Sequence, residues 1–278
     1  MKCLIIDVVH EAIAQELGKY MEVKVSEKLP PAKDELKAMI GDVDVLIMRV
    51  DPMIDKEVLD AAKNLKVIGV CSVGLNHIDT KYAEEKGIKV FNAPGLNGNA
   101  VAELTICKML ELSRHTIPAH RDVTVNQKWD KYAFVGRELR GKTLGVLGFG
   151  RIGKVLAHDL SALGAKVSVS ARKRSDLAWI DAFGYAPLHT NRLSGTLGEF
   201  RVVFNTVPHQ VLDEALLAEL PPDCLLIELA SASGFDMDAV ETLRLSYLKA
   251  GGLPGRVAPE TAARAIKKTL CRLIKEEA

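Results

Sequence analysis

The sequence predicts an α/β protein built from two doubly wound parallel sheets. Two observations predict this. Short apolar runs of strand length alternate with helical stretches in both halves of the chain, and a glycine-rich turn joins a strand to a helix in the second half. With 278 residues, the chain is long enough for two domains that each bury a core of their own.

The first half alternates strands and helices over residues 1–95. Strands are expected at 3–6, 23–25, 45–48, 67–71 and 90–92. Helices are expected near 10–19, 33–40, 56–64 and 80–86. Because a helix follows almost every strand, the strands are expected to run parallel, with helices on both faces of the sheet.

The second half repeats this scheme behind a long helix. The helix is expected over 100–114, and it is apolar on nearly all sides, so we expect it to be buried between domains or between subunits. Strands are expected at 143–147, 166–170, 185–187, 202–205 and 225–229. The segment 123–140 is expected to be irregular, and a final helix is expected over 259–275.

A glycine turn follows the strand at 143–147. The run Gly148-Phe149-Gly150-Arg151-Ile152-Gly153 has the spacing G-x-G-x-x-G, and a helix is expected over 154–163. The glycines permit a tight turn, a close approach of a pyrophosphate, and close packing of helix on strand. The free N–H groups at the start of the helix bind phosphate. These six residues are predicted to bind a dinucleotide; a plain turn between packed elements is the alternative.

The end of the next strand indicates which dinucleotide is bound. An NAD site has an acidic residue here, which binds the ribose hydroxyls. In this chain Ser170 and Ala171 occupy that place, and Arg172, Lys173 and Arg174 follow. No carboxylate repels a 2′-phosphate, and a guanidinium binds phosphate with two parallel hydrogen bonds. The sequence therefore favours NADP(H) over NAD(H), with a solvated basic turn as the alternative.

Two loops of the first half follow strands at the edge where ligands of open α/β sheets bind. Arg49 is the predicted counter-charge for a substrate carboxylate, unless it pairs with Asp51 or Asp55. The second loop is the predicted substrate loop, because the backbone amides of such a turn suit an anion. A plain turn is the alternative interpretation. The residues of this loop are Ser72, Val73, Gly74 and Asn76.

Two loops of the second half follow strands at the corresponding edge. They are predicted to bind the cofactor, and they consist of Asn205, Thr206, Val207, Pro208, Ala230 and Ser231. Asn205, Thr206 and Pro208 are predicted to border the nicotinamide ribose, and Ser231 is also a catalytic candidate. Histidine is the usual proton carrier near neutral pH, and of seven histidines only His77 and His209 stand directly after strand-end loops. His77 or water is the predicted proton donor, with a structural role for His77 as the alternative.

The bulk composition excludes several classes of protein. The net charge of +1 gives no general attraction to nucleic acid or to an anionic membrane, and no apolar run approaches the ~20 residues that cross a bilayer. The apolar run at the N-terminus is too short for a signal peptide, because an acidic residue soon follows it. The five scattered cysteines are expected to be mostly buried, reduced thiols of a cytoplasmic protein, and no Cys/His cluster has metal-ligand spacing.

Motifs over roughly residues 1–165 resemble the D-2-hydroxyacid dehydrogenases, the family of phosphoglycerate dehydrogenase. These motifs are Ser72-Val-Gly-Leu-Asn-His-Ile-Asp79, Asn92-Ala-Pro-Gly95, Val101-Ala-Glu103 and Gly141-Lys-Thr-Leu-Gly145. The resemblance implies a flavodoxin-like substrate domain over 1–95 and 259–278, and a Rossmann dinucleotide-binding domain over 96–258. It also implies a homodimer formed through the dinucleotide-binding domain.

The family's catalytic arginine, glutamate and histidine do not stand at their expected places. Ser231 occupies the arginine's position in Glu228-Leu-Ala-Ser-Ala-Ser-Gly234, which corresponds to a family segment resembling N-x-A-R-G. The stretch that would carry the glutamate is largely deleted. The histidine loop is Leu253-Pro-Gly-Arg-Val-Ala-Pro259, in which Arg256 is a candidate ligand of the substrate carboxylate or a surface cation beside Glu260.

Roughly residues 143–270 resemble the dipicolinate synthase A subunit instead. The motifs are Phe204-Asn-Thr-Val-Pro208, Leu229-Ala-Ser231 and Gly252-Leu-Pro-Gly-Arg-Val-Ala-Pro-Glu-Thr-Ala262. This resemblance implies NADP(H) and a cyclic dicarboxylate.

Together these observations predict an NAD(P)-dependent oxidoreductase that moves a hydride to or from a small carboxylate in the cleft between the domains. The second half favours a cyclic dicarboxylate over a 2-hydroxy or 2-keto acid. The alternative from another class is a catalytically silent dinucleotide-binding subunit or sensor, for which a second subunit would be the partner.

Overall fold

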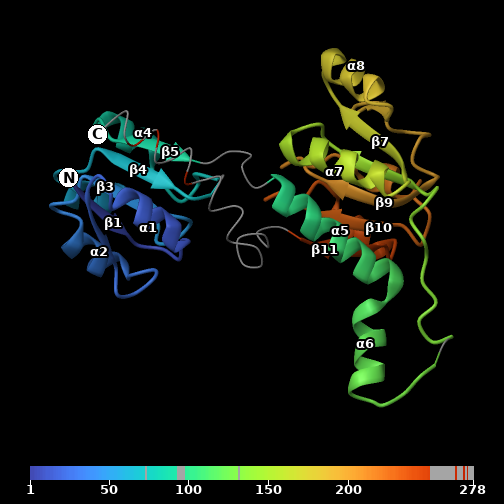
Figure 1. Cartoon of the computed structure of the whole chain (residues 1–278). Helices are drawn as coiled ribbons and strands as arrows, with labels where there is room; N and C mark the ends of the chain where they lie inside the picture. The colour runs from blue at the N-terminus through green and yellow to red at the C-terminus, as the bar shows by residue number, and fades with distance from the viewer. Residues whose placement is uncertain are drawn as a thin grey trace. The chain divides into compact units, whose positions relative to one another are not determined.

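A computed structural model describes residues 1–72, 74–92, 98–130 and 132–250, together with 267, 272 and 274. Its contacts divide the chain into two compact units, Met1–Asn97 with Pro254–Ala278, and Gly98–Leu253. Each unit is described by itself below (Figure 1). The domain limits expected from sequence, 1–95 with 259–278 and 96–258, stay a prediction.

The first unit holds a five-stranded parallel sheet in the order β2-β1-β3-β4-β5, which is the flavodoxin-like strand order. Its strands are β1 (Lys2–Ile5), β2 (Glu22–Val25), β3 (Val45–Met48), β4 (Val67–Val70) and β5 (Lys89–Asn92). Its helices are α1 (Glu11–Leu17), α2 (Lys33–Met39), α3 (Lys56–Ala61) and α4 (Thr80–Glu85).

The central strands of this sheet are buried on both faces, as parallel sheets are. Along β3, Leu46 and Met48 enter one apolar core, whereas Val45 and Ile47 enter the other. This two-residue alternation places helices on both faces of the sheet. Asp55 caps α3 through the Val58 amide at 3.3 Å.

The second unit holds a six-stranded parallel sheet in the order β11-β10-β9-β6-β7-β8. It has the central crossover and the two flanking halves of a Rossmann sheet. The strands are β6 (Thr143–Leu147), β7 (Lys166–Ala171), β8 (Ala186–His189), β9 (Phe200–Asn205), β10 (Leu225–Glu228) and β11 (Ser246–Lys249). The helices are α5 (Gly98–Arg114), α6 (Thr116–Thr124), α7 (Arg151–Ala162), α8 (Arg174–Ala182), α9 (Glu214–Leu217) and α10 (Met237–Thr242).

Two cores cover the two faces of this sheet. Helices α5, α7 and α8 share one core through Met109, Leu156 and Ile180. Helices α9 and α10 share the other through Leu217 and Val240. The fold is therefore α/β with two all-parallel sheets, as the sequence predicts.

Several local expectations need correction. Helix α6 lies partly within the segment expected to be irregular, and strand β11 was not expected. Helix α5 buries only one side within its own unit, since Leu110 and Leu112 are exposed there, and its burial between domains or between subunits stays a prediction. Cys107 is exposed, not buried, because it lies on that outer side. The helix expected over 259–275 lies largely outside the described residues.

No helix of the described part of the chain is long and apolar enough to cross a membrane. The same residues contain no group of His, Cys, Asp or Glu side chains that could hold a metal ion.

Candidate functional site

The glycine turn between β6 and α7 has the backbone that its spacing predicts. Gly148 has a φ of +98°, and a Cβ there would lie 2.6 Å from Thr206 Oγ1. A Cβ on Gly153 would collide with the Gly148 carbonyl oxygen, whereas one on Gly150 would meet nothing within 4 Å. The first and third glycines therefore serve packing, and the exposed second one leaves open space above the turn.

Helix α7 begins directly after this turn. Its N-cap residue is Gly150, which offers no side-chain cap, so the N–H groups of the first turn have no partner from the cap side chain. Arg151 is exposed and Ile152 packs on the core. Phe149 is buried and anchors the turn on the core, and its ring centroid lies 6.3 Å from that of Phe183. These residues fit a pyrophosphate at the helix N-terminus.

The end of β7 presents hydroxyls and cations. The Gly148 amide donates to the Ser170 carbonyl oxygen at 3.1 Å and to Ser170 Oγ at 3.3 Å, and Thr190 Oγ1 donates to Ser170 Oγ at 3.3 Å. Ala171 is buried, whereas Arg172 and Lys173 are exposed and form no ion pair with any residue that the structure describes.

The segment after β9 is fastened to the glycine turn. Thr206 donates twice to the Leu147 carbonyl oxygen, from its amide at 3.0 Å and from Oγ1 at 2.8 Å. The Val207 amide donates to Asn205 Oδ1 at 3.1 Å, and Pro208 is exposed. The structure thus brings Asn205, Thr206 and Val207 to the edge that holds Gly148.

The end of β10 carries a buried carboxylate that sequence reasoning missed. Glu228 is 1% exposed and accepts hydrogen bonds from Asn205 Nδ2 at 2.8 and 3.0 Å, from the Ala230 amide at 2.8 Å and from the Gly234 amide at 2.8 Å. Burial raises the pKa of Glu228, and these donors oppose that shift. The available signal was an acidic residue that ends the apolar run Leu225–Glu228. Ser231, three residues later, is exposed.

A second carboxylate organises the carboxyl edge of the first sheet. Asp7, which follows β1, accepts hydrogen bonds at Oδ2 from the amides of Arg49, Val50 and Asp51 at 3.0, 2.8 and 3.3 Å. Sequence reasoning missed Asp7 as well. It holds the backbone of the loop that carries Arg49, whose guanidinium pairs with neither Asp51 nor Asp55. Asp55 instead pairs with Lys33 at 2.6 Å.

The loop after β4 joins this edge. Ser72 Oγ donates to the Arg49 carbonyl oxygen at 2.8 Å and to the Gly74 carbonyl oxygen at 3.3 Å, while Asn76 is exposed. The structure thus brings Arg49, Ser72 and Gly74 together. Val73 and Arg256 lie outside the described residues.

His77 lies in the same loop and is 7% exposed. Its Nε2 atom has no hydrogen-bond partner among the residues that the structure describes. Burial lowers the pKa of His77, and the nearby Asp51 and Asp7 oppose that shift. His77 is thus a buried imidazole near the carboxyl edge of the sheet, and one of its nitrogens is unpaired within the described part of the chain.

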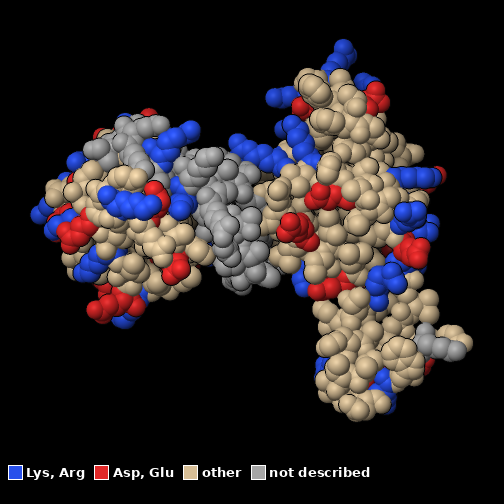
Figure 2. All heavy atoms as spheres, viewed as in Figure 1, with Lys and Arg blue, Asp and Glu red and all other residues tan. Residues whose placement is uncertain are grey.

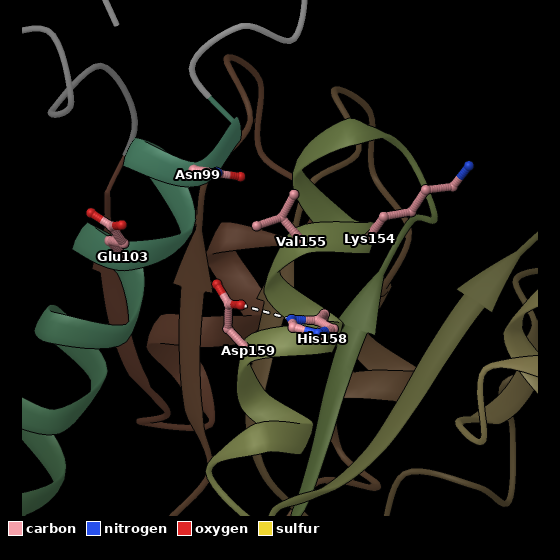
Figure 3. Close-up of a pocket in the computed structure, with 6 residues that line it drawn as sticks. All are labelled: Asn99, Glu103, Lys154, Val155, His158 and Asp159. Atoms are coloured by element: carbon pink, nitrogen blue, oxygen red, sulfur yellow. Dashed lines mark hydrogen bonds and ion pairs between the residues drawn. The ribbon is translucent and has the colours of Figure 1, made fainter. Parts of the chain in front are cut away.

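A surface hollow in the second unit involves other residues. It lies between α5 and α7 and is lined by Asn99, Glu103, Lys154, Val155, His158 and Asp159 (Figure 3). His158 Nδ1 is 3.0 Å from Asp159 Oδ1. None of the site residues expected from sequence lines this hollow.

The fold and the glycine turn define a dinucleotide-binding α/β protein of two parallel sheets. Residues 3–272 match the family model of the D-isomer specific 2-hydroxyacid dehydrogenase catalytic domain. The chain belongs to this family of oxidoreductases, for which a nicotinamide dinucleotide is the typical cofactor.

Relatives with assigned activities support this membership. The chain is 34% identical over 211 residues to a hydroxypyruvate reductase of Thermotoga maritima, which covers 75% of this chain and 67% of the relative. It is 33% identical over 238 residues to a glyoxylate reductase of Thermofilum pendens, covering 84% and 69%. A D-3-phosphoglycerate dehydrogenase of Methanocaldococcus jannaschii is 41% identical over 167 residues, 60% of this chain but 31% of the relative.

Solved structures share the fold over the whole chain. The TT0316 protein from Thermus thermophilus has a TM-score of 0.82 at 27% identity and covers 100% of this chain and 98% of its own. A dipicolinate synthase chain from Bacillus halodurans, of the kind that the second half resembles, has a TM-score of 0.74 at 23% identity, covering 98% and 97%. This second likeness concerns the fold alone.

Proposed function

We propose that this protein reduces a small 2-keto acid, or oxidises the corresponding 2-hydroxy acid, with NADP(H). The glycine turn at Gly148–Gly153 carries the proposal, because it offers open space at Gly150 and a helix start without a side-chain cap. The reductases among the relatives favour a 2-keto acid over the cyclic dicarboxylate.

The basic turn after β7 supports NADP(H) over NAD(H). Ser170 takes the place of the acidic residue of an NAD site, and its hydroxyl is engaged with the Gly148 amide and with Thr190. Arg172 and Lys173 are exposed and free of ion pairs within the described residues, so their charges are open to a 2′-phosphate. The small side chain of Ala171 allows the cofactor to approach the end of β7 closely.

The substrate's carboxylate is assigned to the edge of the first sheet. Arg49 supplies the positive charge, and Ser72, Val73, Gly74 and Asn76 supply polar groups of the loop, with Arg256 as a further cation. The reaction adds a hydride from C4 of the nicotinamide to the keto carbon and a proton to its oxygen, and leaves oxidised cofactor. His77 Nε2 or water supplies that proton; in the first case a neutral His77 must first take one up.

In this proposal the chain performs the chemistry without the arginine, glutamate and histidine that the family resemblance implies. Ser231 is exposed at the arginine's place, and it hydrogen-bonds the substrate's carbonyl as a weaker polarising group than a guanidinium. The consequence is a low kcat, because the weaker polarisation slows the chemical step rather than substrate binding.

Two other functions are supported by specific observations. The likeness of Phe204–Pro208 and Leu229–Ser231 to the dipicolinate synthase chain favours a cyclic dicarboxylate substrate. Ser231, which stands in the sequence at the place of the family's arginine, favours a silent dinucleotide-binding subunit with a second protein as its partner.

A homodimer is part of the proposal. The end of α5, helix α6 and the chain after it expose a run of apolar side chains, namely Leu110, Leu112, Ile117, Val123, Val125, Trp129, Tyr132 and Val135. Figure 2 shows few charged atoms on this part of the second unit. An exposed apolar surface of this kind is typical of an interface between protein chains.

The test follows the absorbance of NADPH, which falls when NADPH reduces glyoxylate, hydroxypyruvate or pyruvate in one series and rises when NADP⁺ oxidises a dihydropyridine dicarboxylate to the pyridine in another. Turnover of a 2-keto acid supports the proposal, and turnover of the dicarboxylate alone selects the second substrate class. NADPH binding without turnover of either series identifies the silent subunit, and the absence of NADPH and NADH binding overturns all three functions.

A further inference from the structure

The buried carboxylate of Glu228 lies at the carboxyl edge of the second sheet, at the end of β10. Asn205 and Glu228 are the last residues of β9 and β10 and stand opposite each other in the register of these strands. Asn205 is fully buried, and its Nδ2 atom also donates to the Val207 carbonyl oxygen at 2.8 Å. One amide side chain therefore connects the carboxylate to the segment that follows β9.

The loop after β10 is wrapped around the same carboxylate. The amides of Ala230 and Gly234 both point at Glu228, one to each oxygen. A Cβ on Gly234 would collide with the Asn205 side chain, so only glycine closes the loop this tightly. The Gly234 carbonyl oxygen in turn accepts the amides of Val211 and Leu212 at 2.8 and 3.0 Å.

This edge belongs to the nicotinamide half of the unit. In a Rossmann sheet each half binds one mononucleotide, and here the first half, β6 to β8, carries the pyrophosphate turn and the basic turn for the adenosine ribose. The second half, β9 to β11, is then left for the nicotinamide ribose and ring. Loops 205–208 and 229–234 belong to this half and would line the site of the nicotinamide ribose and ring.

The hydrogen bonds of Glu228 also define what it does. Its partners among the described residues are all N–H donors, so each carboxylate oxygen is satisfied in the ionised form and has no proton to give. We propose that Glu228, held by Asn205, is a positioning residue that shapes the nicotinamide side of the cofactor site. This inference rests on the proposed function as an NADP(H) enzyme.

The test compares two probes on the same variants. Glu228→Gln keeps the shape of the side chain but turns an NH₂ group toward one of the N–H donors, which breaks a charge-assisted hydrogen bond. We expect the Kd for NADPH to rise about tenfold and kcat to fall, while the Kd for adenosine 2′,5′-bisphosphate, which lacks the nicotinamide half, stays within about twofold of the wild type.

Glu219→Gln is the matched control. Glu219 also ties a loop, through Ser194 Oγ and the Gly195 amide at 2.8 Å each, but at the segments that precede β9 and β10. We expect it to leave both Kd values unchanged. If Glu228→Gln fails to fold, Asn205→Ala takes its place, because it removes the side-chain donor and leaves the two backbone donors of Glu228.

The outcomes separate this inference from the function it rests on. Selective loss of NADPH affinity supports it. Equal weakening of both probes would show that Glu228 only supports the fold, and wild-type affinity of the variant for NADPH would show that it positions nothing; either overturns the inference. A wild-type protein that binds neither probe overturns the NADP(H) assignment itself.

Discussion

Thr206 donates to the carbonyl oxygen of Leu147 with both its amide and its hydroxyl, at 3.0 and 2.8 Å, and so clamps the segment after β9 onto the strand that leads into the glycine turn. Thr206→Val removes the hydroxyl at constant shape. We expect a loss of about 1 kcal/mol in the free energy of unfolding. We also expect weaker NADPH binding, measured by calorimetry, with Thr206→Ser restoring it.

Thr196→Val is the control for this clamp, because Thr196 Oγ1 also donates to a backbone carbonyl oxygen, that of Leu193, at 2.6 Å. It should lower stability by a similar amount and leave NADPH affinity unchanged. A loss of NADPH affinity in both variants would contradict the clamp.

The glycines of the turn have different roles, since one is needed for packing and another leaves space for the cofactor. A Cβ on Gly153 meets the Gly148 carbonyl oxygen, so Gly153→Ala should lower the free energy of unfolding by about 1–3 kcal/mol. Gly150→Ala meets open space and should leave the thermal midpoint unchanged, yet it should weaken NADPH binding because its methyl group fills the place of the pyrophosphate. Equal effects of the two variants on stability would contradict this division.

Arg172 decides the choice of cofactor in our account. Arg172→Ala should raise the Kd for NADPH about tenfold, since a charge-assisted hydrogen bond is lost, and leave the Kd for NADH unchanged. Lys166→Ala, at the opposite end of β7, is the control and should change neither value. A similar change for both cofactors would assign Arg172 to general electrostatics.

His77 makes stability depend on pH. Burial lowers its pKa below the ordinary value of about 6.5, so between the lowered pKa and 6.5 the unfolded chain binds a proton that the folded chain does not. The free energy of unfolding therefore falls as the pH drops through this window, by up to about 1.4 kcal/mol per pH unit.

Urea midpoints at pH 8 and pH 5.5 check this dependence. His77→Gln should lose less stability on acidification than the wild type. His158→Gln, at an exposed position, should follow the wild-type profile. Identical profiles for the wild type and His77→Gln would refute the effect.

The apolar surface around α6 predicts self-association. Val125 is 66% exposed, and Val125→Asp should shift a dimer toward monomer in sedimentation velocity. Val25→Asp, at a position 47% exposed in the first unit, should leave the dimer intact. A monomeric wild-type protein would remove this part of the proposal.

Local patterns predict the two sheets and the glycine turn, because strand alternation and φ requirements act within a few residues. They do not predict α6 or β11. Helix α6 buries none of its side chains, so it lacks the buried stripe by which an amphipathic helix is recognised, and the four residues of β11 are at most half-buried. The roles of Asp7 and Glu228 also escape prediction. Asp7 binds the amide of Asp51, 44 residues away, and Glu228 binds Asn205 across a strand pair, so both depend on the assembled sheet.

The central claim is hydride transfer from NADPH to a 2-keto acid, and isotope transfer tests it most directly. The wild-type protein is incubated with NADPH that carries deuterium at the transferred C4 position and with hydroxypyruvate or glyoxylate, and the products are analysed by mass spectrometry. We predict a hydroxy acid with deuterium at C2. Bound NADPH that keeps its deuterium with every keto acid would contradict the claim.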